Sequence, residues 1–148
     1  MDFIQSATPD SLQYLIKDLF ETVTLYDNKV TNCQTKQLAN GQYEVSCKVI
    51  VSKYRSGSQG IRIYSDNRLD SLSHQLATDK TIHSLPLADY IEIGVFGADK
   101  KELFVQKYLF NQIEKELRIV VDSLPVSVAV DPYFKLIDRE GGDNWRFF

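Results

Sequence analysis

The sequence predicts a mainly β protein, an immunoglobulin-like antiparallel β-sandwich preceded by one amphipathic helix. Short runs of alternating apolar and polar residues recur along the chain, turn-forming residues separate them, and a helical apolar pattern occurs once, near the start. A barrel is the alternative, which the pattern hardly distinguishes from a sandwich. Because the chain has 148 residues and neither an internal repeat nor a linker, we expect residues 1–148 to form a single domain.

The helix is predicted over residues 9–21. Thr8 suits the capping position and Pro9 the first helical position. Five apolar side chains then follow at the spacing of one helix face: Leu12, Leu15, Ile16, Leu19 and Phe20. The polar face lacks the lysines and arginines typical of helices that lie on membranes, so we expect this apolar stripe to pack against the protein.

The strands are predicted from the period of two that a half-buried strand shows. They cover residues 22–26, 29–37, 43–51, 61–64, 89–96, 103–109, 115–121 and 126–130. Asp27 and Asn28 are expected to form a turn or bulge between the first two. Residues 65–84 form an irregular segment, in which three leucines at helical spacing allow a short helix or an ordered loop.

The hairpin over residues 89–110 is expected to lie at the centre of a sheet. Its predicted core side chains are Ile91, Ile93, Val95, Leu103, Val105 and Leu109. The opposite set is too apolar for a solvated face: Phe96, Phe104, Tyr108 and Phe110. Either the helix over residues 9–21 covers this second set, which is the simpler expectation, or the four side chains form an interaction face for a partner.

Two cysteines flank a turn signal at residues 38–42. If the hairpin closes through a three-residue loop with Gly41 in the left-handed region, Cys33 lies opposite Cys47, whereas a two-residue Asn-Gly turn separates them. Two interpretations remain open. The thiols are two small buried side chains, or they form a cross-strand disulfide, which implies an oxidising compartment.

Composition and motifs argue against several functions. The net charge of −3 argues against a nucleic-acid-binding surface, and no run reaches the roughly 18 apolar residues of a membrane span, so we expect no membrane insertion by this segment. His74 and His83 match no metal-binding spacing, and no G-x-S-x-G motif occurs. We therefore expect no enzyme and no cofactor in this chain.

The acidic C-terminal run offers one candidate metal site. Asp131, Asp138 and Asp143, with two glycines nearby, could supply oxygen ligands to calcium, although their spacing differs from that of an EF-hand loop. Aspartates beside glycine and proline are more often turn-formers.

Four stretches of the chain resemble the C-terminal end of a bacterial membrane protein family. They are Leu19–Val30, Gly41–Val45, Pro86–Phe96 and Val130–Arg139. In that family an ABC-transporter-type permease region is fused to an aminopeptidase-N-like zinc metallopeptidase region. The resemblance spans about residues 9–145; residues 65–84 look like an insertion, and the two cysteines are not part of it.

The resemblance implies a non-catalytic accessory domain that packs on, or positions, the peptidase region of a larger membrane-anchored chain. The family's H-E-x-x-H motif has no counterpart here, so no catalytic residue is carried over. The domain would lie outside the cytoplasm, on the periplasmic side, which favours a bond between Cys33 and Cys47. The natural chain would then extend upstream of Met1. A rival hypothesis is a carbohydrate- or peptide-binding sandwich module.

Overall fold

The computed structural model describes residues 2–21, 23–56, 62–64, 87–138 and 140–148. The chain divides into two compact units, one made of Met1–Leu25 and Lys53–Pro86, the other of Tyr26–Ser52 and Leu87–Phe148. The irregular segment predicted at residues 65–84, with His74 and His83, lies outside the described residues. The single domain expected over residues 1–148 stays a prediction.

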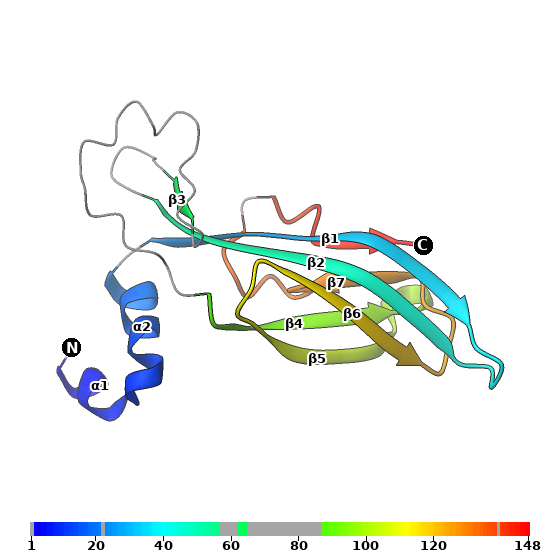
Figure 1. The fold of residues 1–148 in the computed structure, drawn as a ribbon, viewed down its shortest axis with the longest axis horizontal. Coiled ribbons are helices and arrows are strands. Elements are labelled where there is room, and N and C mark those ends of the chain that lie inside the picture. The colour runs from blue at the N-terminus through cyan, green and yellow to red at the C-terminus, as the bar shows by residue number, and fades with distance from the viewer. Residues whose placement is uncertain (1, 22, 57–61, 65–86, 139) are drawn as a thin grey trace. The chain divides into compact units, whose positions relative to one another are not determined.

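The described residues form a mainly β structure with two antiparallel sheets (Figure 1), as the sequence predicts. The first sheet has the order β1 (Thr24–Gln37), β2 (Tyr43–Ser56) and β3 (Arg62–Tyr64), with β6 (Glu114–Val121) also pairing with β2. The second sheet has the order β5 (Glu102–Phe110), β4 (Asp89–Phe96), β7 (Ser127–Val130) and β8 (Trp145–Phe147). The three-residue strand β8 was not predicted.

The two sheets share one core within the second unit, which makes the arrangement sandwich-like. Alternate side chains of β2 and β6 enter it from the first sheet, and those of β4 from the second. The fully or almost fully buried members include Val45, Val49, Val51, Ile91, Ile93, Val95, Val128 and Val130. The predicted core positions on β4 are therefore confirmed. On β5 the predictions for Val105 and Leu109 are wrong, because these residues pair with Gly94 and Tyr90, on the face away from the core.

The turn between β1 and β2 has the three-residue form. The Leu38 N–H donates to the Gln42 carbonyl at 2.8 Å, and Gly41 has a φ of +88°, in the left-handed region that glycine favours. The register that places Cys33 opposite Cys47 is the one that this turn produces.

The turn or bulge expected at Asp27 and Asn28 is wrong, because β1 continues through both residues and its burial alternates regularly there. The C-terminal segment supplies backbone partners at this point. The N–H of Tyr26 donates to the Ile137 carbonyl at 2.9 Å, and that of Val30 to the Asp143 carbonyl at 3.1 Å. Partners more than 100 residues away in sequence thus override a local turn signal.

The first unit begins with short helical pieces rather than one helix. They are α1 (Asp2–Ala7), a 3₁₀ turn (Asp10–Leu12), α2 (Gln13–Ile16) and a π-helical turn (Lys17–Glu21). A helical segment is confirmed close to the predicted range, but its single apolar stripe is not, since Ile16 is buried while Leu19 and Phe20 are exposed. The change of winding moves residues off the 3.6-residue period on which the stripe depends.

Among the described residues, none of the helices has the length and apolar character that crossing a membrane requires.

Candidate functional site

A groove with an aromatic floor lies on the outer face of the second sheet, the face away from the core. Phe96 at the end of β4 pairs with Ser127 on β7, which pairs in turn with Phe147 on β8. Trp145 shares that face because it lies two residues before Phe147. The ring centroids of Phe96 and Trp145 are 5.0 Å apart, and those of Trp145 and Phe147 are 6.4 Å apart. Three rings from two strands thus form one aromatic row.

The missing side chain of Gly94 makes room for this row. A Cβ at Gly94 would lie 2.5 Å from Cε2 of Phe96 and 3.3 Å from Cγ of Pro132. The Phe96 ring therefore folds back over the backbone of β4, where it is almost fully buried.

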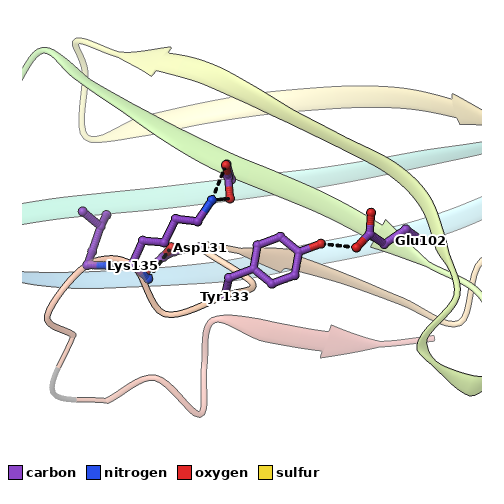
Figure 2. A network of polar contacts seen from close by, with 6 residues as sticks. Glu102, Asp131, Tyr133 and Lys135 are labelled. Carbon is purple, nitrogen blue, oxygen red and sulfur yellow. Dashed lines mark hydrogen bonds and ion pairs between the residues drawn. The ribbon is translucent and has the colours of Figure 1, made fainter.

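A short loop after β7 forms one wall of the groove (Figure 2), and Asp131 holds it in shape. Oδ1 of Asp131 accepts from the Lys135 N–H at 3.0 Å, and Oδ2 accepts from the Leu136 N–H at 2.9 Å. The carboxylate is almost fully buried, and Asp131 itself has a φ of 45°. One side chain thus closes the loop through two charge-assisted hydrogen bonds.

Two further side chains of this loop bind it to the outer face of β4 and β5. Nζ of Lys135 lies 2.7 Å from both carboxylate oxygens of Glu92, and the Tyr133 hydroxyl donates to the carboxylate of Glu102 (Figure 2). The hydrogen bond to Glu102 raises the pKa of Tyr133 above its ordinary value. The hydroxyl is therefore protonated at neutral pH, and the wall keeps its bonds to both Glu102 and Glu92.

The turn between β4 and β5 forms the opposite wall. It is closed by a hydrogen bond of 2.8 Å from the Gly97 N–H to the Lys101 carbonyl. Asp99 and Lys100 inside it have φ values of 54° and 57°. Residues other than glycine rarely adopt this backbone conformation, and lysine adopts it less readily than aspartate does.

The groove has a volume of about 670 Å³, within the range of known ligand sites. Its lining is mostly apolar and consists of Phe96, Gly97, Asp99, Lys100, Glu102, Val126, Ser127, Pro132, Tyr133, Phe134, Trp145 and Phe147. Sequence reasoning named only Phe96 among its aromatic side chains. The available signal was the density of aromatic residues in the tail, at positions 133, 134, 145 and 147.

The four aromatic side chains predicted as one interaction face do not lie together. Phe96 is on the outer face of the sheet, whereas Phe110 belongs to the core and Phe104 and Tyr108 pack against it. The register between β4 and β5 shifts between Val95 and Phe96, which separates Phe96 from the other three. The predicted need for a helix to cover this set therefore disappears.

Two of the three calcium candidates, Asp131 and Asp138, bind backbone N–H groups with their carboxylates. Both oxygens of Asp131 bind the loop described above, and Oδ2 of Asp138 accepts from the Asn28 N–H at 2.8 Å. Asn144, with its amide oriented to donate, also bonds to Asp138. Within the described part of the chain, no three acidic, histidine or cysteine side chains gather as a metal site would require. The bonds of Asp131, and a bond of 3.0 Å from the Glu140 N–H to Oδ1 of Asp138, are local and match the turn-forming alternative. For Asp143 that alternative stays a prediction.

Asp143 gives a pH-dependent prediction. Burial raises its pKa, and so does repulsion from Asp27 and Asp138. A carboxyl group that binds its proton more tightly when folded costs stability once it ionises, so stability from this group falls as pH rises through its folded pKa. We expect Asp143→Asn to raise the Tm at pH 7 by up to about 2 °C, and to have no effect near pH 3, where the carboxyl is protonated in both states.

Calorimetric melting at the two pH values measures this effect, with Glu116→Gln as the control because Glu116 is exposed on β6. A lower Tm for Asp143→Asn at pH 7 would show that the ionised form is needed.

The first unit contains a buried ionic cluster that the sequence did not suggest. Oδ1 of Asp18 lies 2.8 Å from Nη2 of Arg55, and Oδ2 lies 2.5 Å from Nζ of Lys53, an ion pair without hydrogen-bond geometry. Nζ of Lys53 also lies 5.1 Å from the centroid of the Tyr14 ring. Because each charge has an opposite charge or a ring beside it, the cluster fits a structural role, joining the helical segment to β2.

Comparison with known protein families, with characterised proteins and with solved structures finds no match to this chain.

Proposed function

We propose that this chain is a non-catalytic interaction domain that binds an apolar segment of a partner protein in the aromatic groove. The observation behind this proposal is the build of the groove: an aromatic row on a rigid sheet, between two walls that hydrogen bonds and an ion pair hold in place. Aromatic anchors on a rigid support are typical of binding surfaces.

Backbone strain around the groove supports the same proposal. Five described non-glycine residues have positive φ, and three of them line the groove: Asp99, Lys100 and Phe134. Each such conformation costs on the order of 1–3 kcal/mol and concentrates where function requires a particular shape. Among the described residues, most of this backbone strain therefore lies around the groove.

The polar groups of the groove favour a protein segment over a sugar. A carbohydrate site needs free acceptors and donors for ring hydroxyls, but the Glu102 carboxylate already accepts from Tyr133, and Glu92 beside the groove is paired with Lys135. Apart from Asp99 and Lys100 on the wall at the β4–β5 turn, the lining that remains is mostly aromatic and apolar, which suits a phenylalanine, tyrosine or leucine side chain of a partner.

Binding of labelled hexapeptides with a central phenylalanine, followed by fluorescence polarisation, tests the proposal. We expect Phe147→Ala to weaken binding at least about tenfold, since Phe147 is 67% exposed and one of the rings at the floor. Tyr90→Ala is the matched control, because Tyr90 is 66% exposed on the same sheet face but outside the groove. Equal losses in both variants, or competition by cellohexaose, would contradict the proposal.

We propose further that the partner segment belongs to a peptidase-like region of the same, longer, membrane-anchored chain, on its extracytoplasmic side. The support is the resemblance of the four stretches, of which Val130–Arg139 contains the groove wall at residues 132–134. The domain then positions the peptidase region and contributes no catalytic group or cofactor. In that longer chain, Phe147→Ala should lower peptidase activity or folding yield and Tyr90→Ala should not; unchanged behaviour in both would exclude the positioning role.

For the fold, we propose the immunoglobulin-like class. The strand order supports it: β1-β2-β6 corresponds to strands A-B-E of that class, and β5-β4-β7-β8 to C′-C-F-G. An experimental structure with a different strand order would contradict this assignment.

A further inference from the structure

The two cysteines lie opposite each other across the β1–β2 hairpin. The turn is closed by the pair Leu38 and Gln42, whose backbone hydrogen bond measures 2.8 Å. Cys33 precedes Leu38 by five residues and Cys47 follows Gln42 by five, so the antiparallel register brings them together.

Their thiols are free, the Cys33 thiol donates to the Thr31 carbonyl at 3.5 Å, and each thiol shifts the pKa of the other. Cys47 is buried in the core, while Cys33 is half-buried and packs against the same core from the strand at the edge of the first sheet. Facing residues of neighbouring antiparallel strands have the Cα separation that a disulfide needs.

We propose that Cys33 and Cys47 are a modification site, which an external disulfide oxidises to a cross-strand bond. The Cys33 thiolate attacks one sulfur of the oxidant, forming a mixed disulfide and releasing one oxidant thiolate. The Cys47 thiolate then attacks the Cys33 sulfur and releases the second. The two cysteines lose two protons and two electrons, and the oxidant, a protein or glutathione disulfide, is reduced to two thiols.

The two thiols differ in the way this order of attack requires. The hydrogen bond from Cys47 lowers the pKa of Cys33, while that bond and burial raise the pKa of Cys47. The more exposed thiol is therefore the better initial nucleophile, and the buried thiol reacts only after the mixed disulfide has formed beside it.

The bond would close a loop over residues 34–46 and fix the register of β1 on β2. The bond would lie one residue after Asn32, which has a φ of 50° inside the strand. The proposal does not depend on the aromatic groove, because neither cysteine lines it.

The test incubates the full chain with oxidised glutathione and then alkylates the denatured protein before mass spectrometry. We expect an unlabelled monomer about 2 Da lighter than the reduced chain, and a Tm at least about 5 °C higher, which reductant reverses. Cys33→Ser, at the more exposed position, should fold, remain monomeric and lose the Tm difference between oxidised and reduced samples. Two alkylated thiols in the oxidised sample, or disulfide-linked dimers as its main product, would overturn the proposal.

Discussion

Replacing Phe110 by alanine is expected to lower the free energy of unfolding by about 4 kcal/mol. Phe110 is 1% exposed and packs in the core between the sheets, with Nζ of Lys115 5.6 Å from its ring centroid. The substitution removes a complete aromatic side chain from a site where both sheets must move to fill the space.

Leu109 is the matched control, since it is adjacent in β5 but 38% exposed on the opposite face. Leu109→Ala should cost less than about 1 kcal/mol in the same urea unfolding experiment. Comparable losses for the two variants would mean that β5 does not present the face described here.

Asp131→Ala is expected to lower the free energy of unfolding by about 3 kcal/mol. The substitution leaves the N–H groups of Lys135 and Leu136 without their acceptor, and each hydrogen bond to a charged group contributes about 1.5–3 kcal/mol. Asp131→Asn retains one carbonyl oxygen as an acceptor and should cost about half as much. Urea unfolding of the two variants measures both values.

Asp131→Ala should also weaken the binding of peptides in the groove. Asp131 closes the loop that carries Tyr133 and Phe134, so its removal frees the wall that these residues form. Peptide binding by Asp131→Ala should therefore fall along with stability. Full stability in Asp131→Ala would show that the two hydrogen bonds do not hold the loop.

The strands were predictable where only one face of a strand is apolar. In β2, Val45, Val49 and Val51 alternate with side chains that are polar except for Ile50, and the predicted strand matches the observed one over its first nine residues. β5 is apolar on both faces, so periodicity could not select the buried one. The bulge between Val95 and Phe96 decides the register there, and no residue pattern announces it.

The groove could not be predicted as a site because its parts are distant in the chain. Phe96 meets Trp145 across 49 positions of sequence through strand pairing with β7, and β8 has only three residues, too few for a periodic signal. The roles of the acidic residues were partly predictable, because aspartates beside glycine and proline commonly form turns. Which backbone groups Asp131 and Asp138 bind depends on the folded tail.

The central claim, that the groove binds an apolar protein segment, has a direct optical test. Trp145 is the only tryptophan of the chain and lines the groove, so its fluorescence reports occupancy of this site alone. Titration with the hexapeptides that contain a central phenylalanine should shift its emission to shorter wavelength and saturate. The midpoint should be the same in the parent chain and in Tyr90→Ala, and at least about tenfold higher in Phe147→Ala. An emission spectrum that does not change on titration, or an unchanged midpoint in Phe147→Ala, would contradict the account.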